Sequence, residues 1–324
     1  MAALRLAAQG VRLTTLNTIR SHSARSFTTS ALRLSANVDG VDSVSVIGAG
    51  QMGLGIALVA ARNASLPVTL IDSSQASIDK STAFMSKLLA KDVSKSKLTE
   101  SEAEEIKSRI TTTTDIASVA STDFIIEAVP EIVDLKLSIF NQLSTLAKPT
   151  AILATNTSSI SITKIAAAAG SAADRVLSTH FMNPVPVQTG VEIISGLQTS
   201  PKTLETALAL CKAMGKIPSQ SADTPGFLAN RILMPYINEA VICLESNIGT
   251  REDIDAIMKN GTNVPMGPLT LADFIGLDTC LAIMNVLYRD TGDSKYRPSV
   301  LLQRMVDAGW LGKKSGRGFY EYKK

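Results

Sequence analysis

The chain has 324 residues, of which 45% are hydrophobic and 19% are charged, and its formal net charge is +3. This length is enough for two domains with sizeable cores, and the composition is that of an ordinary globular protein. No apolar run reaches the roughly 18 residues of a membrane span. Three cysteines without metal-ligand spacing favour neither a disulfide framework nor a metal site, so we expect no metal.

Residues 1–34 differ from the rest, because they contain five arginines, many Ser, Thr, Ala and Leu, and no acidic residue. This composition is typical of a mitochondrial transit peptide, so we expect a mature chain from about Ser35 in the mitochondrial matrix. A basic tail that binds an acidic partner is the alternative. Without these arginines the charge is 27 basic minus 29 acidic residues, or −2, which does not favour nucleic-acid binding.

Short apolar runs alternate with longer helical patterns over residues 43–196. We predict a long helical region between residues 75 and 109. The predicted strands are 43–48, 67–72, 123–129, 151–156, 175–180 and 191–196. This alternation favours an α/β fold, a Rossmann-type doubly wound parallel sheet with helices on both faces.

Most of these apolar runs end on a glycine or a polar residue. Ligands of open parallel sheets bind outside the carboxyl ends of the strands, so we expect a site at this edge. Strand ends are commonly polar, but this general tendency is a weak explanation for so many of them. The residues concerned are Gly48, Asp72, Glu127, Asn156 and His180.

The pattern becomes purely helical after residue 222. Asp223 and Thr224 are helix-capping residues, and Pro225 suits the first turn of a helix that is apolar on nearly every side and therefore buried. We expect residues 35–222 to form the Rossmann-type domain and residues 223–324 an all-helical domain. The apolar excess of the helical domain indicates a contact with a second copy of the chain.

The stretch "GAGQMG" (48–53) matches the pattern G-x-G-x-x-G between a predicted strand and a predicted helix. Asp72 follows at the end of the next strand, which completes the dinucleotide fingerprint. Its carboxylate suits an adenine ribose and would repel a 2′-phosphate, so we expect NAD rather than NADP. The helix N-terminus would stabilise the pyrophosphate. The predicted cofactor-binding residues here are Gly48, Gly50, Gln51, Met52, Gly53 and Asp72.

The chain has two histidines, and His22 lies in the predicted leader, which leaves His180. Oxidation of an alcohol by NAD requires a base for the hydroxyl proton, and imidazole titrates in the suitable range. Glu192 follows twelve residues later, after a turn that would bring two strands side by side. We therefore predict a catalytic dyad of His180 and Glu192. A histidine satisfied by local hydrogen bonds is the alternative.

Other polar residues near these motifs suit a substrate site. The hydroxyl of Ser158 would hold the substrate oxygen, Asn183 follows His180 closely, and Asn230 would approach from the second domain. Capping and turn formation are the alternative roles for isolated Asn and Ser.

Three lysines, Lys87, Lys91 and Lys95, are spaced to form one basic stripe on a helix. Such a stripe would hold the phosphates of a large anionic substrate, although a solvated helix face has the same spacing.

Taken together, the chain resembles the short-chain 3-hydroxyacyl-CoA dehydrogenase family over residues 44–324. The stretches that carry the resemblance are "VIGAGQMGLGIA", "ILATNTSSISIT", "HFMNPVPV" with "VEII", "PGFLANRILMPYINEA", "MGPLTLADFIGLD", "GDSKYRP" and "GWLGKKSGRGFYEY".

The resemblance implies a reversible oxidation of (S)-3-hydroxyacyl-CoA by NAD, with 3-hydroxybutyryl-CoA as the expected substrate, in fatty-acid β-oxidation or butanoate metabolism. It implies a homodimer that forms through the helical domain. His180 would be the general base and Glu192 its partner. The other implied contacts are Ser158, Asn183 and Asn230 for substrate or nicotinamide, Glu127, Asn156 and Lys314 for NAD, and Lys91 and Lys95 for CoA.

Two departures from the family pattern flank the predicted catalytic loop. Gln188, Thr189 and Gly190 replace a frequent "MKL", and Met182 replaces a frequent Phe. They concern the acyl-chain preference rather than the dyad.

Two other functions are the alternatives to this reaction: a dehydrogenase of a free hydroxy or sugar acid, and a non-catalytic NAD-binding protein.

Overall fold

The computed structural model describes Val38 and residues 40–323, and the predicted leader, residues 1–34, lies outside the described residues. Within the described part, no single helix is long and apolar enough to cross a membrane. Helices α9 (Pro268–Ile275) and α10 (Leu277–Thr291) would reach that length only together, across a bend of 96°.

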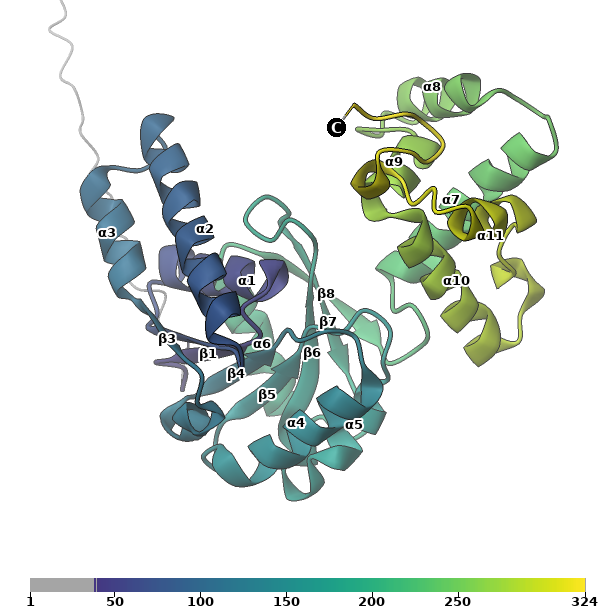
Figure 1. Cartoon of the computed structure of the whole chain (residues 1–324). Coiled ribbons are helices and arrows are strands. Elements are labelled where there is room, and N and C mark those ends of the chain that lie inside the picture. The colour runs from purple at the N-terminus through teal and green to yellow at the C-terminus, as the bar shows by residue number, and fades with distance from the viewer. Residues whose placement is uncertain (1–37, 39, 324) are drawn as a thin grey trace, which may run out of the picture. The chain divides into compact units, whose positions relative to one another are not determined.

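One eight-stranded sheet organises the first part of the chain, with strand order β3-β2-β1-β4-β5-β6-β7-β8 (Figure 1). All neighbouring strands are parallel except β6 and β7, which are antiparallel. The expected α/β fold is therefore confirmed. The strands are β1 Val44–Ile47, β2 Val68–Ile71, β3 Ile110–Thr113, β4 Phe124–Glu127, β5 Ile152–Thr155, β6 Val176–Phe181, β7 Gly190–Ser195 and β8 Ile217–Ala222.

Helices cover both faces of this sheet, as the buried runs of β1, β4 and β5 require. One core cluster contains side chains of α1, α2, α3 and α6, and a second contains side chains of α4 and α5. The helices are α1 Gln51–Asn63, α2 Gln75–Ser94, α3 Glu100–Ser108, α4 Val133–Leu146, α5 Ile162–Ala168 and α6 Pro201–Ala213.

The described residues after β8 form helices without strands, as expected, and they have a core of their own. These helices are α7 Ala229–Glu245, α8 Arg251–Gly261, α9, α10 and α11 Val300–Asp307.

Two strands, β3 and β8, were not predicted from the sequence, and they lie at the two edges of the sheet. Their sequences, "ITTT" and "IPSQSA", are polar, and most of their side chains are partly or fully exposed. Pro218 in β8 is tolerated because an edge strand does not need every ladder hydrogen bond. Edge strands have one open side, so they lack the apolar signal of buried strands.

The predicted start of α7 at Pro225 was wrong, because the helix begins at Ala229. Gly226 (φ +78°) and Phe227 (φ +49°) adopt left-handed backbone conformations, which end any helical run before Leu228.

Asp223, expected to cap α7, instead caps α5. Its carboxylate accepts hydrogen bonds from the backbone amides of Ile162 (3.0 Å) and Thr163 (2.8 Å). Nor is α7 buried all round: the side chain of Ile232 is 70% exposed.

Candidate active site

The carboxyl ends of five adjacent strands, β2, β1, β4, β5 and β6, lie side by side, as predicted from the polar residues at their ends. The register places Ile47 beside both Ile71 and Glu127, and Glu127 beside Thr155. The segments that follow these strands therefore meet at one edge of the sheet.

The glycine-rich turn after β1 has the geometry of a dinucleotide site. A Cβ at Gly48, whose φ is +105°, would lie 2.6 Å from the carbonyl oxygen of Ala128, and one at Gly53 would lie 1.8 Å from that of Gly48. Nothing lies within 4 Å of the Cβ position of Gly50, so a ligand can approach the backbone there. The turn therefore fits a pyrophosphate at the N-terminus of α1.

Asp72 follows β2 and is held by the backbone. Oδ2 accepts a hydrogen bond from the amide of Ala49 (2.8 Å), and Oδ1 accepts one from Ser74 (2.9 Å). Each carboxylate oxygen can accept a second bond, so the half-buried Asp72 fits a ribose hydroxyl.

The other two residues of the predicted fingerprint, Gln51 and Met52, have side chains that make contacts within the protein. Gln51 donates a hydrogen bond from Nε2 to Oδ1 of Asn183 (3.1 Å), which joins α1 to the loop after β6. Met52 is partly buried and packs against the core on one face of the sheet.

The structure brings His180 and Glu192 together. They are directly opposite each other in the antiparallel β6–β7 pair, so both side chains lie on one face of the sheet. His180 Nδ1 is 2.8 Å from Glu192 Oε2, and both residues are buried.

Glu192 also contacts the beginning of α7. Its Oε1 accepts hydrogen bonds from the amides of Leu228 and Ala229, both at 2.8 Å. Burial raises the pKa of Glu192, but the hydrogen bonds from His180, Ala229 and Leu228 outweigh this effect and lower it. The carboxylate is therefore ionised at neutral pH.

The second ring nitrogen of His180 faces the loop after β5. His180 Nε2 is 3.1 Å from Ser158 Oγ. The side-chain Nδ2 of Asn230 donates to the carbonyl oxygen of Ser158 (3.3 Å), and Asn156 Oδ1 accepts from the backbone amide of Phe181 (2.8 Å). If Nδ1 carries the proton that faces Glu192, Nε2 is a free acceptor directed at this loop.

Glu127, predicted to contact the cofactor, does not face the edge of the sheet. Its side chain is fully buried, and Oε1 lies 2.7 Å from Nζ of Lys136 while Oε2 accepts a hydrogen bond from Thr155 Oγ1 (2.7 Å). Both oxygens of this carboxylate are therefore engaged by groups of the protein, and its contact with NAD stays a prediction.

The carboxylate at the edge is that of Glu131, a residue that the sequence analysis missed. Its side chain is 36% exposed, and it binds the loop that carries Ser158. The signal was weak: "EAVPE" contains two glutamates, and only Glu131 lies beyond the strand, after Pro130.

The predicted lysine contacts lie outside the dyad. Lys91 and Lys95 are exposed, with Lys91 in the last turn of α2 and Lys95 at its C-cap. Lys314 lies in the C-terminal helical part, where its ammonium pairs with Asp278 at 2.6 Å. The structure places no contact of these three lysines on His180 or Glu192 within the described ranges.

Two family models match the chain. "3-Hydroxyacyl-CoA dehydrogenase, NAD binding domain" matches residues 43–224, and "3-hydroxyacyl-CoA dehydrogenase, C-terminal domain" matches residues 226–322. The first match agrees with the geometry of the glycine-rich turn, and NAD is the cofactor.

Relatives cover nearly the whole chain. A probable 3-hydroxybutyryl-CoA dehydrogenase from Deinococcus radiodurans is 50% identical over 86% of this chain and 99% of its own. The mitochondrial hydroxyacyl-coenzyme A dehydrogenase from Rattus norvegicus is 42% identical over 86% and 91%. The crystal structure of (S)-3-hydroxybutyryl-CoA dehydrogenase from Ralstonia eutropha matches with a TM-score of 0.85 and 47% identity, over 88% and 100%.

Gly53→Ala should weaken NADH binding by at least about tenfold, because the added Cβ would meet the carbonyl oxygen of Gly48 at 1.8 Å and force the turn open. The measurement is titration of NADH fluorescence. Gly261→Ala is the matched control, since the nearest atom to its added Cβ is 3.8 Å away. Equal NADH affinity in both variants would contradict this account of the turn.

Proposed function

The chain belongs to the 3-hydroxyacyl-CoA dehydrogenase family, and we propose that it oxidises short-chain (S)-3-hydroxyacyl-CoA reversibly to 3-oxoacyl-CoA with His180 as the base. It is an NAD-dependent oxidoreductase that acts on the CH–OH group of 3-hydroxyacyl-CoA. The observation that carries the proposal is the buried contact of 2.8 Å between His180 Nδ1 and Glu192 Oε2.

In the proposed oxidation, His180 Nε2 accepts the proton of the 3-hydroxyl group while the hydrogen on the same carbon leaves as hydride. NAD, when bound, supplies the hydride acceptor. Glu192 keeps the proton on Nδ1 beforehand and stabilises the imidazolium afterwards. This stabilisation is strong because both side chains are buried, where charges are poorly screened. In the reverse direction, the imidazolium returns its proton to the oxygen of the 3-oxo group.

Ser158 supplies the second contact for the reacting oxygen. Its hydroxyl lies 3.1 Å from the nitrogen that would accept the proton, so one substrate oxygen can reach both groups. The side chain of Asn230, on the first turn of α7, donates a hydrogen bond to the carbonyl oxygen of Ser158, and we propose that Asn230 also contacts the substrate. Asn183 accepts a hydrogen bond from Gln51, which follows the glycine-rich turn, and we propose that Asn183 contacts the substrate or the nicotinamide.

The CoA part of the substrate would bind the exposed lysines of α2. Lys91 and Lys95 offer positive charge that suits phosphates. Binding of this remote group would help to position the reacting carbon. The relatives named 3-hydroxybutyryl-CoA dehydrogenase support a short acyl chain, and fatty-acid β-oxidation or butanoate metabolism is the proposed setting.

The predicted domain organisation extends this proposal. Residues 35–222 would bind NAD and carry the dyad, and residues 223–324 would complete the substrate site and form a homodimer. Exposed apolar residues of the helical part support such a contact, among them Ile232 (70% exposed), Ile248 (74%) and Ile257 (66%).

Analytical ultracentrifugation should give twice the mass of one chain, and a monomer at micromolar concentration would contradict the dimer.

We place the enzyme in the mitochondrial matrix. The composition of residues 1–34 and the mitochondrial relative from Rattus norvegicus support this location, while the relative from Deinococcus radiodurans is bacterial. N-terminal sequencing of the protein from isolated mitochondria should begin near Ser35. An intact Met1, or absence from the organelle, would contradict the proposal.

His180→Ala should lower kcat by a factor on the order of 10²–10⁴, because the hydroxyl proton loses its acceptor. NADH binding, measured by fluorescence, should be unchanged, since the glycine-rich turn is untouched. Near-normal turnover by the His180→Ala variant would remove the mechanism.

The substrate class is tested by NADH oxidation with acetoacetyl-CoA, longer 3-oxoacyl-CoAs and free acetoacetate side by side. We expect the highest kcat/KM for the four-carbon thioester and a loss of at least about a hundredfold for the free acid, since the remote binding energy of CoA is lost. Comparable rates with the free acid would favour the hydroxy-acid alternative. NADH binding without turnover of any substrate would favour a non-catalytic protein.

A further inference from the structure

A lysine side chain is fully buried beside the candidate active site. Lys136, on α4, is 0% exposed, and its ammonium lies 2.7 Å from Glu127 and 3.4 Å from Glu131. It also donates to the carbonyl oxygen of Val129 (3.3 Å). A buried ammonium is costly unless it is paired and hydrogen-bonded, so these contacts determine where it lies. The two carboxylates therefore share one fixed cation.

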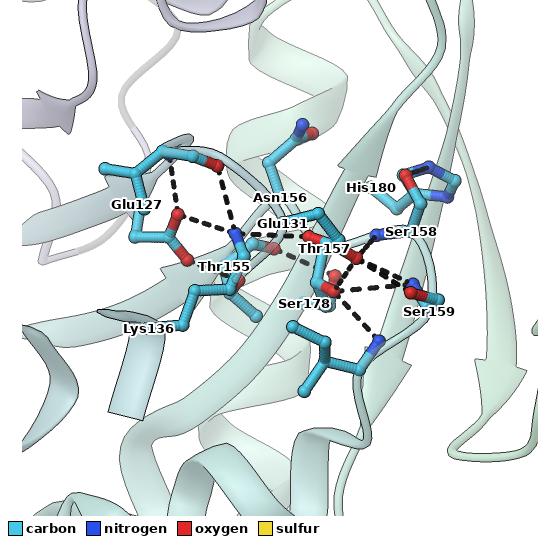
Figure 2. A network of polar contacts seen from close by, with 12 residues as sticks. Glu127, Glu131, Lys136, Thr155, Asn156, Thr157, Ser158, Ser159, Ser178 and His180 are labelled. Carbon is cyan, nitrogen blue, oxygen red and sulfur yellow. Dashed lines mark hydrogen bonds and ion pairs between the residues drawn. The ribbon is translucent and has the colours of Figure 1, made fainter. Parts of the chain in front are cut away.

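The two glutamates have different surroundings. Glu127 is fully buried, and its oxygens are occupied by Lys136, Thr155 and the amide of Val129. Glu131 is partly exposed and faces the loop after β5 (Figure 2). Of these two carboxylates, Glu131 is the one whose side chain binds residues 157–159 of that loop.

One oxygen of Glu131 collects the polar groups of the loop. The Oε1 atom accepts hydrogen bonds from Thr157 Oγ1 (2.5 Å), the amide of Ser158 (2.8 Å), and the amide (3.0 Å) and hydroxyl (3.1 Å) of Ser159. Four donors on one oxygen wrap residues 157–159 around the carboxylate, as Figure 2 shows. Hydrogen bonds to an ionised acceptor are stronger than neutral ones.

The charge of Glu131 is maintained by its neighbours. Burial raises the pKa of Glu131, but the charge of Lys136 and the hydrogen bonds from Thr157, Ser158 and Ser159 outweigh it and lower the pKa. The group therefore remains a charged acceptor at neutral pH.

This arrangement fixes Ser158 from two sides. Its amide is held by Glu131, and its carbonyl oxygen is held by Asn230. The hydroxyl that remains lies 3.1 Å from His180 Nε2. A shift of about 1 Å at a reacting centre can reduce a rate by a factor of roughly a hundred, so the backbone anchor has a kinetic consequence.

We propose that Glu131, anchored by the buried Lys136, is a positioning residue that sets the hydroxyl of Ser158 against His180. The inference rests on the proposed function, because it takes Ser158 to hold the substrate oxygen. Glu131 acts through Ser158, and the acceptor of the proton is still His180. Loss of its charge should therefore affect only those steps in which Ser158 takes part.

The test is a double-mutant cycle of wild type, Glu131→Gln, Ser158→Ala and the double variant, with acetoacetyl-CoA and NADH. In Glu131→Gln an amide NH₂ replaces an oxygen, so the charge pair with Lys136 is lost. We expect this variant to lower kcat by a factor on the order of 10 to 100. In the Ser158→Ala background, Glu131→Gln should lower kcat by less than about twofold, because the effects of two coupled residues are not additive.

A second readout does not depend on turnover. The ring ¹⁵N resonances of His180 are recognised by their loss in the His180→Ala variant, because the other histidine of the sequence, His22, lies in the predicted leader. In the protein without ligands, Glu131→Gln and Ser158→Ala should shift the Nε2 resonance in the same direction, because each removes the Ser158 contact. Glu104→Gln on α3, whose side chain is 76% exposed, is the matched control for both readouts.

The results distinguish the positioning role of Glu131 from the role of Ser158 in the proposed function. Two results would contradict the positioning role while the proposed function stands, provided that Ser158→Ala itself slows turnover. In the first, Glu131→Gln lowers kcat by the same factor in the Ser158→Ala background as in the wild type. In the second, Glu131→Gln alone leaves both kcat and the His180 resonance unchanged. If Ser158→Ala turns over like wild type, the role of Ser158 fails and the inference fails with it. Because Glu131 is partly exposed, Glu131→Gln should fold, which the thermal transition checks.

Discussion

The structure of the site depends on one carboxylate that is shared between two parts of the chain. Glu192 directs one oxygen to His180 Nδ1 and the other to the amides of Leu228 and Ala229. Burying a carboxylate costs several kcal/mol, and hydrogen bonds to each oxygen are needed to offset this cost. The same bonds orient the imidazole and satisfy the backbone amides at the start of α7. As a result, Asn230, the next residue along, reaches the Ser158 loop.

The other elements of the site follow from the order of the strands. The segments after β1 and β2 supply the glycine-rich turn and Asp72, which suit NAD, whereas β6 and β7 supply the dyad. Between them, β4 and β5 end beside the buried Lys136 (Figure 2). The contacts of Lys136 with Glu127 and Glu131 join the end of β4 to the loop beside His180. The polar contacts thus continue across the edge of the sheet, and a substrate held by Ser158 would lie beside the cofactor turn.

Much of this arrangement could be predicted from the sequence, because it depends on local patterns. The buried strands have continuous apolar runs, the turn has its glycines, and His180 and Glu192 belong to consecutive strands whose pairing fixes their register. The missed features depend on tertiary contacts. The edge strands β3 and β8 have no apolar pattern, and the start of α7 depends on left-handed residues beside Glu192. The sequence spacing also does not distinguish the roles of Glu127 and Glu131. Both carboxylates contact Lys136, and only the tertiary structure shows that Glu127 is buried whereas Glu131 is partly exposed.

The most direct test of the central claim is Glu192→Gln, followed by turnover and by the ¹⁵N resonances of His180. The two backbone amides of Leu228 and Ala229 require the carbonyl oxygen of the new side chain, so its NH₂ group would face His180 and could not accept the Nδ1 proton. We therefore predict a change from the Nδ1–H to the Nε2–H tautomer and a loss of kcat on the order of a thousandfold or more. NADH should still bind, because the glycine-rich turn lies on other strands. Turnover within a few-fold of wild type, with the Nδ1–H tautomer retained, would contradict the claim that this carboxylate organises the site.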